Sequence, residues 1–598
     1  MSISSKAVDS FLQRLSPIDR HFGNLLERLS GGSNPALRLA AGLVSYATTE
    51  QGHVCITLAN VSEYLGEHEV VLEFPETESW ISQLRATSVV GSPSEFRPLI
   101  LDAQGRLYLH RYWKYENALA EQIKSRVHAA SFARETLRDG LQRLFPRQQS
   151  EINWQQVAGA VAVTRNFTVI SGGPGTGKTT TVLKILALLA EQSFPRKLRI
   201  ALAAPTGMAA ARLAESIQNG KPTLNCREEI KAMIPEKATT IHRLLGRKGN
   251  SLQFHQNEKN LLSVDVVVID EASMVDLSLM SHLLRAVPET AKVILLGDKD
   301  QLTSIDAGAV LSDLCNGAFN YFSEPFRALY HELTDQTLPD AGQPSAIKDG
   351  VVLLRGNFRF SAEIQALSAA IRDHNAGSAI SMLKANPEGV SFQSLPELKH
   401  LESSLSQPVL ENWQSYFEAK DPLARLKAFN QFRVLCALRH GPFGVVKLNQ
   451  LVEKILERNQ LIPGGERWYE GRPIIITRND YSLNLFNGDV GVTCMDPQTN
   501  ELCIYFVSEE NAVRRLLPLQ LPEHETAFAT TVHKSQGSEF EKVLLLLPDR
   551  DCPVLTAELI YTGLTRARRG VTLWSSEEIL NVAITRQVER HSALQGNW

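Results

Sequence analysis

Short apolar runs alternate with amphipathic helical stretches from about residue 151 onward, and this alternation predicts a parallel α/β sheet. Strands of such a sheet are buried on both faces, so their sequences are apolar throughout instead of alternating with polar residues. Each run ends in a polar or charged turn, at the sheet edge where folds of this kind bind ligands. The expected strands are residues 167–170, 200–203, 266–269 and 293–296.

A second α/β pattern follows, with expected strands at residues 433–436 and 543–546. Between them, at about 465–522, short strands and turns rich in Asn, Asp and Gly indicate a small inserted β domain. Residues 318–350 lose helical periodicity and contain Pro325, Pro339 and Pro344, so we expect an irregular connection there. The two α/β units are therefore expected at 141–345 and 346–598.

Residues 1–140 contain no nucleotide motif and are expected to be mostly helical. One predicted helix carries Ile18, Phe22, Leu25, Leu26 and Leu29 on one face. Another is expected to begin with Asn34 as its N-cap and Pro35 at its first position. This region is either a stabilising appendage or a docking surface, and its sequence supports the two interpretations equally.

Composition narrows the class of protein without identifying it. The chain has 598 residues, 43% hydrophobic and 21% charged, with a net charge of −3, so any binding of nucleic acid must rest on local sites. Without a signal peptide or a long apolar run, a cytoplasmic protein is expected. Its seven cysteines are scattered and form no C-x-x-C pair, which favours a reducing compartment; spacing alone leaves an iron–sulfur site open.

A phosphate-binding loop carries the strongest chemical signal. Residues 172–179 read GGPGTGKT, which fits G-x-x-x-x-G-K-[ST] between an apolar strand and an amphipathic helix. Lys178 is expected to reach the β and γ phosphates of a nucleoside triphosphate, and Thr179 to bind Mg²⁺. The predicted ATP-binding residues of the loop are Gly172, Gly173, Pro174, Gly175, Thr176, Gly177, Lys178, Thr179 and Thr180.

Polar residues after the other strands fit the same chemistry. Asp270 and Glu271 follow an apolar strand about ninety residues after the loop, so Asp270 is expected to hold Mg²⁺ and Glu271 to polarise the attacking water. Gln301, after the next strand, is expected to sense the γ-phosphate or position the water. Gln155, just before the first strand, has an amide suited to the adenine edge.

Two distant arginines complete the candidate catalytic set. Arg359 in NFRF and Arg566 in YTGLTRARR are expected to stabilise the charge of the transition state, as arginine fingers do in phosphoryl transfer. The neighbouring Arg568 and Arg569 fit better with solvent or DNA phosphate than with catalysis.

The order of these segments resembles a known family. GGPGTGKT, APTGMAAARL, TTIHRLLG, IDEAS, GDKDQLTSIDAG, GNFRF, TTVHKSQGSEF and YTGLTRARR are similar to the motif series of superfamily 1 DNA helicases of the 5′→3′ branch, and most closely to the RecD family. The motifs span about 150–575. Weaker similarity extends to the GHVC segment at residues 52–55 and to LCALRHGPFGV at 435–445.

The resemblance implies two RecA-like motor cores with ATP between them, an SH3-like β insertion and an activity that uses ATP and Mg²⁺ to move 5′→3′ on single-stranded DNA. It implies contacts with the DNA backbone, which carry no sequence code. The segment at about 247–262 is the candidate pin that splits the strands. The implied DNA-binding residues are Pro205, Thr206, Thr240 and His242 in the first core, and Thr531, His533 and Lys534 in the second.

The resemblance also implies RecB-like and RecC-like partner subunits in a heterotrimer that processes duplex DNA ends, with docking through residues 1–140. The family usually has lysine where this chain has Met208. No separate nuclease constellation is present, so the resemblance assigns nuclease activity to another subunit. The alternatives are a stand-alone RecD-like helicase and a scaffold that ATP switches between conformations.

Overall fold

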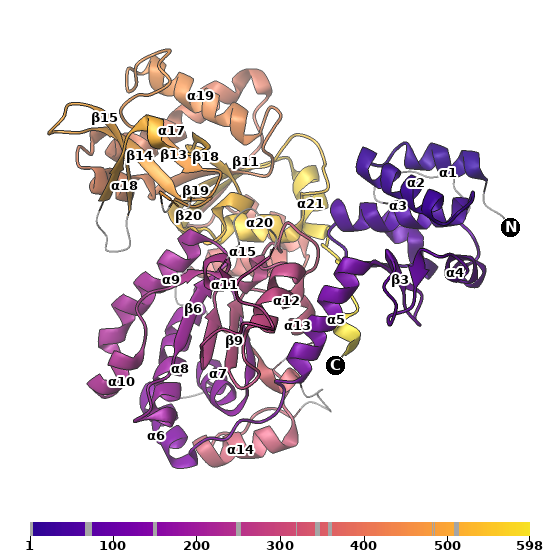
Figure 1. The fold of residues 1–598 in the computed structure, drawn as a ribbon. Coiled ribbons are helices and arrows are strands. Elements are labelled where there is room, and N and C mark those ends of the chain that lie inside the picture. Colours follow the sequence, from indigo (N-terminus) through magenta and orange to yellow (C-terminus); the bar gives the residue numbers. More distant parts are fainter. Residues whose placement is uncertain are drawn as a thin grey trace.

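The computed structural model describes residues 4–65, 74–146, 152–246, 253–317, 320–340, 347–356, 361–480, 482–483, 485–507 and 513–597. The chain forms an N-terminal unit, a first parallel sheet with its helices, and a second parallel sheet that carries an antiparallel sheet (Figure 1). Within the described residues, no helix is both long and apolar enough to cross a membrane.

The N-terminal unit packs helices against a small sheet. The helix α3 (Pro35–Thr49) begins as expected, with the Asn34 side chain accepting a hydrogen bond from Leu37 N and Pro35 in the first turn. This helix is buried on almost every side because it lies between α2 (Pro17–Leu29) and the sheet. The sheet has the order β1-β4-β3-β2, and the apolar pattern does not reveal it. Its strands are β1 (Cys55–Thr57), β2 (Val90–Gly91), β3 (Leu99–Leu101) and β4 (Arg106–Leu109), and the other helices are α1 (Ser5–Leu12) and α4 (Thr77–Arg85).

The first large sheet has six parallel strands in the order β10-β5-β9-β8-β6-β7. One face packs against α7 (Trp154–Thr164) and α8 (Lys178–Ser193), and the other against α5 (His110–Lys124) and α12 (Leu277–Ala286). All four strands expected here are present. Their bounds are β5 (Phe167–Ser171), β6 (Ile200–Ala204), β7 (Thr239–Thr240), β8 (Val266–Ile269), β9 (Lys292–Gly297) and β10 (Val351–Leu353).

Packing does not follow the expected boundaries at 140 and 345. The helix α5 lies before residue 140, yet its apolar face is buried in the core of the first parallel sheet. The helix α6 (Arg134–Leu144) spans the expected boundary and packs on α7 and α8, which cover that sheet. The strand β10 follows residue 345 and pairs with β5 in that same sheet. The connection expected to be irregular contains α14 (Glu324–Thr334), capped by the Ser323 hydroxyl. Pro325 occupies the first turn of this helix, where its missing N–H costs nothing.

The second large sheet has five parallel strands in the order β11-β20-β19-β12-β18, and it includes both strands expected from the sequence. An antiparallel sheet of order β16-β15-β14-β13-β17 is inserted between β12 and β18. The parallel strands are β11 (Val390–Gln393), β12 (Phe432–Cys436), β18 (Ala529–Thr531), β19 (Phe540–Leu546) and β20 (Ala567–Trp574). The inserted strands are β13 (Pro473–Ile476), β14 (Val490–Met495), β15 (Leu502–Val507), β16 (Val513–Leu516) and β17 (His524–Thr526).

The end of the chain returns to the first two units. After α21 (Glu577–Thr585) the backbone leaves the second sheet and passes beside α13 (Val310–Cys315) and the N-terminal unit (Figure 1). Leu594 is buried in the same core as α5 and α12. The second parallel unit is therefore joined to the first by its C-terminal residues as well as by the connecting chain.

Candidate functional site

The phosphate-binding loop has the backbone that the motif requires. It leaves β5 and enters α8, and Gly175 and Gly177 have φ angles of +84° and +81°, which favour glycine. A Cβ at Gly172 would lie 2.7 Å from Thr176 Oγ1. The tight turn therefore directs the loop toward the N-terminus of α8, where backbone N–H groups and the helix dipole attract anions.

Lys178 lies over this loop. Its Nζ donates hydrogen bonds to the carbonyl oxygens of Gly172 at 2.6 Å and Gly173 at 3.1 Å. Thr179 follows in the first turn of α8 and is half-buried. Both side chains are therefore at the helix N-terminus that would receive a phosphate.

Asp270 and Glu271 lie just beyond β8, on the same edge of the sheet. Burial raises the pKa of Asp270, the charge of Glu271 adds to the effect, and Lys178 opposes it. Glu271 has a φ of +50°, an uncommon conformation for a residue with a side chain. Such strained backbone is concentrated at functional sites, and the charge of Lys178 acting on Asp270 shows that this carboxylate lies near the phosphate loop.

The donor set fits Mg²⁺. The carboxylate of Asp270 and the hydroxyl of Thr179 are hard oxygen ligands, and Mg²⁺ commonly takes only one or two such ligands besides phosphate and water. Among the described residues no group of three or more His, Cys, Asp or Glu could hold a metal ion, so a cage made of protein alone is not formed there.

Gln301 is buried between the two parallel sheets. Its Nε2 donates to Asp298 Oδ2 at 3.0 Å, and its Oε1 accepts from Arg566 Nη2 at 2.9 Å. Arg566 comes from the second unit, so the predicted pair Gln301 and Arg566 is brought together by the fold. Tyr561, on α20 (Ala557–Leu564), donates its hydroxyl to the same Asp298 Oδ2 at 3.0 Å.

Two further contacts of this interface are not anticipated by the sequence. Leu302 N donates to Thr562 Oγ1 at 2.9 Å, and Gln536 Nε2 donates to the Leu302 carbonyl at 2.9 Å. Asp298 is buried, and burial raises its pKa. Tyr561 and Thr562 lie inside the YTGLTRARR segment, but nothing in their spacing indicates that they face the first sheet.

Gln155 lies beside the phosphate loop, as the ATP-binding hypothesis requires. Asn153 caps α7, and the Gln155 Nε2 donates to the Thr176 carbonyl at 3.1 Å. The preceding Trp154 has the Arg355 guanidinium 5.6 Å from its ring centroid. Arg359, the other predicted arginine, lies outside the described residues.

The predicted DNA-binding residues of the first unit lie at the ends of neighbouring strands. Thr206 follows β6 and caps α9 (Gly207–Gly220), and Thr240 ends β7 and caps α11 (Ile241–Leu245). Pro205 is in the turn before Thr206. His242, in α11, has its ring 5.9 Å from that of Phe254. These four residues are therefore on one edge of the sheet.

The predicted DNA-binding residues of the second unit cluster just after β18. Thr531 Oγ1 accepts from Lys534 N at 3.2 Å, and Lys534 Nζ pairs with Glu525 Oε2 at 3.1 Å. Burial, followed by the charge of Arg590, lowers the pKa of His533. All three residues lie at the carboxyl end of a strand, as their counterparts in the first unit do.

The two units meet beside these residues. The Ser538 hydroxyl is 2.7 Å from the sulfur of Met208, and a Cβ at Gly537 would lie 3.5 Å from that of Ala209. The position at which the family usually has lysine is therefore in contact with the second unit. Of the pin candidate, residues 247–252 lie outside the described residues, and Phe254 packs against the first core.

Comparisons with known proteins agree on one family. Residues 12–108 match the family model "RecBCD enzyme subunit RecD, N-terminal domain", residues 155–307 an AAA domain, and residues 526–574 a UvrD-like helicase C-terminal domain. The chain is 33% identical to the RecBCD enzyme subunit RecD of Haemophilus influenzae, over 92% of this chain and 88% of the relative. It is 36% identical to that of Mycobacterium tuberculosis strain H37Rv, over 96% and 94%.

Two further matches are more distant. The ATP-dependent RecD2 DNA helicase of Deinococcus radiodurans is 29% identical over 82% of this chain, but only 58% of that protein is covered. A Bacteroides Pif1 structure bound to single-stranded DNA is 17% identical, with a TM-score of 0.38, over 72% of this chain and 94% of the other.

Proposed function

The chain belongs to the RecD family, and from this premise we propose that it is an ATP-dependent DNA helicase that moves 5′→3′ on single-stranded DNA. It would be the motor subunit of a RecBCD-type complex that unwinds and degrades DNA from double-strand ends in recombinational repair. The observation that carries the proposal is the hydrogen-bonded chain from Asp298 through Gln301 to Arg566, which connects the phosphate site of one sheet to the other.

Each residue of the ATP site has a proposed role. Lys178 would exchange its bonds to the Gly172 and Gly173 carbonyls for bonds to the β and γ phosphates. Glu271 would orient the attacking water and accept its proton, and Arg566 would stabilise the charge that develops on the phosphoryl group, together with Arg359. Thr179 and Asp270 would hold Mg²⁺, which neutralises phosphate charge when bound, and Gln155 would bind adenine.

Movement would follow from the two units gripping DNA in turn. Pro205, Thr206, Thr240 and His242 would hold the backbone from one RecA-like core, and Thr531, His533 and Lys534 from the other. Nucleotide binding would close the cleft between the two units, and hydrolysis would reopen it. A grip on the backbone alone suits a motor that must pass over any sequence. The antiparallel insertion would be the SH3-like module of the family.

The N-terminal unit is the proposed docking surface for a RecC-like subunit, with a RecB-like subunit completing the heterotrimer. Three apolar side chains of α2 support this, because Ile18, Leu25 and Leu29 are 66%, 42% and 57% exposed on one stripe of the helix. We place the complex in the cytoplasm and assign its nuclease activity to another subunit.

Unwinding of tailed duplexes tests this function. The wild-type protein is expected to hydrolyse ATP in response to single-stranded DNA and to unwind a duplex with a 5′ tail. Lys178→Gln should abolish both activities while the protein stays folded. Unwinding that requires a 3′ tail would contradict the polarity, and hydrolysis by Lys178→Gln at the wild-type rate would contradict the proposed site. Equal amounts of two larger partners in a native pull-down would separate a RecBCD-type subunit from a stand-alone helicase.

A further inference from the structure

The C-terminal strap, defined here as residues 586–594, connects all three parts of the molecule. Arg586 anchors its start to the second unit through Asp551 and the carbonyls of Cys552 and Leu555. Beyond it, Ser592 Oγ donates to Asp313 Oδ2 at 2.8 Å, and Ala593 N donates to Glu116 Oε1 at 2.9 Å. The strap therefore leaves the second unit and ends on the first.

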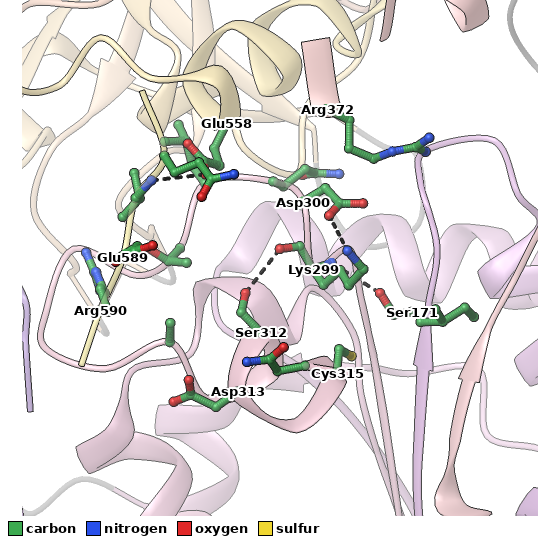
Figure 2. A pocket seen from close by; sticks show the side chains of 18 of the residues that line it. Ser171, Lys299, Asp300, Ser312, Asp313, Cys315, Arg372, Glu558, Glu589 and Arg590 are labelled. Atoms are coloured by element: carbon green, nitrogen blue, oxygen red, sulfur yellow. Dashed lines mark hydrogen bonds and ion pairs between the residues drawn. The ribbon is translucent and has the colours of Figure 1, made fainter. Parts of the chain in front are cut away.

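Arg590 of the strap holds a loop of the first unit. Its Nη1 donates to the carbonyl oxygens of Asp306 at 2.9 Å and Gly308 at 3.0 Å, and lies 3.4 Å from Ser304 Oγ. These residues form the second half of the 298–308 loop, whose first half contains Gln301. Arg590 and residues 299–303 also line one cavity of about 990 Å³ that reaches Gly172 and Gly173 (Figure 2).

The N-terminal unit packs against Arg590 and the residue after it. Gly52 has a φ of +75°, and a Cβ at this position would lie 2.8 Å from Arg590 Cζ. The Gly52 carbonyl accepts from Gly308 N at 2.9 Å, and the His53 Nδ1 accepts from His591 N at 2.9 Å. Residues 52–55, the GHVC segment, therefore form the surface against which the strap packs, which we call the seat of the strap.

The segment of the second unit that holds the predicted DNA-binding residues 531–534 reaches the same loop, because Gln536 Nε2 donates to the Leu302 carbonyl at 2.9 Å. The first half of the 298–308 loop is bonded to Arg566 and Thr562, and its second half to Arg590. The first half is therefore held by Arg566, Thr562 and Gln536, and the second half by Arg590 of the strap that leaves the second unit.

We infer that Arg590 is a positioning residue that couples DNA binding to ATP turnover, by holding the second half of the 298–308 loop against the second unit. The inference rests on the helicase function proposed above. When DNA shifts residues 531–534 relative to the first unit, the strap transmits the shift to the loop that carries Gln301. Because Arg590 acts through the backbone carbonyls of Asp306 and Gly308, its loss should change turnover more than nucleotide affinity.

Kinetics of the full-length chain test the inference. At saturating single-stranded DNA, Arg590→Gln should lower the kcat for ATP by about tenfold, the factor expected for losing one charge-assisted hydrogen bond, with the KM for ATP within about twofold. Arg590→Lys should recover part of kcat. Gly52→Ala should reproduce the defect by displacing Arg590. Gly31→Ala is the matched control, because Gly31 also has a positive φ but no atom lies within 4 Å of the Cβ that alanine would add.

Three results would overturn the inference. An Arg590→Gln variant that melts earlier yet keeps the wild-type kcat would make Arg590 only a stabilising residue. Recovery of kcat at higher DNA concentrations would make it a DNA-binding residue. In amide hydrogen exchange, a non-hydrolysable ATP analogue should alter Leu302 and Gly308 together in the wild type, but Leu302 alone in Arg590→Gln; a joint change in the variant would also refute it. A wild-type protein without DNA-stimulated hydrolysis would instead refute the proposed function.

Discussion

Arg566 Nη2 donates a hydrogen bond to Gln301 Oε1 at 2.9 Å across the interface of the two parallel units, and both side chains are buried. The guanidinium is also held by the carbonyls of Thr562 at 3.1 Å and Ser538 at 3.2 Å. Three nitrogens of one rigid group are therefore fixed, so its direction is set before any nucleotide arrives. Such preorganisation is what electrostatic stabilisation of a transition state requires.

Arg566→Lys tests whether this fixed geometry matters. Lysine keeps the charge but cannot form three bonds in the plane of a guanidinium, so we expect the kcat for ATP to fall by roughly 10²-fold or more. The KM for ATP should change far less. Arg568→Lys is the matched control two residues away, because Arg568 is exposed and paired with Glu539. Steady-state ATPase assays at saturating DNA measure both, and equal losses in the two variants would contradict the role of Arg566.

Glu271→Gln separates binding of ATP from its hydrolysis. The amide keeps the size of the side chain but is a poor proton acceptor, so hydrolysis should fall by roughly 10³-fold while nucleotide still binds. Single-turnover hydrolysis and the affinity for a fluorescent ATP analogue measure the two steps. Glu289→Gln, at an exposed position of the same unit, should behave as the wild type. Rapid single-turnover hydrolysis by Glu271→Gln would remove Glu271 from the mechanism.

Tyr561→Phe tests the interface while every predicted catalytic residue is left unchanged. The change removes the only tyrosine hydroxyl bonded to Asp298 among the described contacts, and should destabilise the protein by about 1–2 kcal/mol. Tyr505→Phe is matched to it, since Tyr505 is also buried and donates to a carboxylate, Asp496 Oδ2, at 2.9 Å in the inserted sheet. We expect similar losses of stability but a roughly tenfold fall in ATPase only for Tyr561→Phe. Equal ATPase rates would show that Tyr561 only stabilises the fold.

The sequence reveals the parts of this site that are continuous along the chain. The phosphate loop, Asp270 with Glu271, and the strands that carry them are local patterns, because a strand buried on both faces must be apolar and a phosphate loop must be rich in glycine. The contacts between the two parallel units are different. Tyr561 contacts Asp298, and Arg590 contacts Gly308, only because of the way the units pack, and no local sequence pattern encodes these contacts.

The differences between the expected and the observed unit boundaries also arise because packing, and not sequence proximity, decides which unit an element joins. Sequence proximity groups the helix α5 with residues 1–140, whereas its apolar face is buried in the core of the first sheet. It groups the strand β10 with the second unit, although its backbone completes the edge of the first. In α14, Pro325 suggests a helix breaker, but in the first turn it is compatible with a helix.

The stability of the seat of the strap should fall at acid pH. Burial, then the charges of His591 and Arg590, lower the pKa of His53 to about 3 from an ordinary value of about 6.5. Between these values the unfolded chain binds a proton that the folded chain does not, so stability is lost as the pH falls below about 6.5, by up to about 1.4 kcal/mol per pH unit. The protection of the Val54 amide against hydrogen exchange, relative to its intrinsic rate at each pH, measures this loss locally, because the Val54 N–H donates to the His591 carbonyl.

A non-titrating replacement isolates the contribution of His53. In the His53→Asn variant the side-chain amide oxygen can still accept from His591 N. The protection of the Val54 amide against exchange should therefore depend less on pH between about 7 and about 5. His21→Asn, at an exposed position of α2, should leave the pH dependence as in the wild type. If His53→Asn retains the full pH dependence, another group controls the seat of the strap.

The apolar stripe of α2 gives the sharpest test of docking. Because Ile18 and Leu25 are exposed, the double change Ile18→Glu with Leu25→Glu should alter stability by no more than about 0.5 kcal/mol. Burying two carboxylates in an apolar interface is costly, so the RecB-like and RecC-like subunits should no longer co-purify with the chain. Leu519→Glu is the control, because Leu519 is 99% exposed and belongs to the inserted β unit, whose strands β14 and β15 lie on the opposite side of Figure 1 from α2. Retention of both subunits by the α2 variant would move the docking surface elsewhere, whereas a loss caused by Leu519→Glu alone would place it on the insertion.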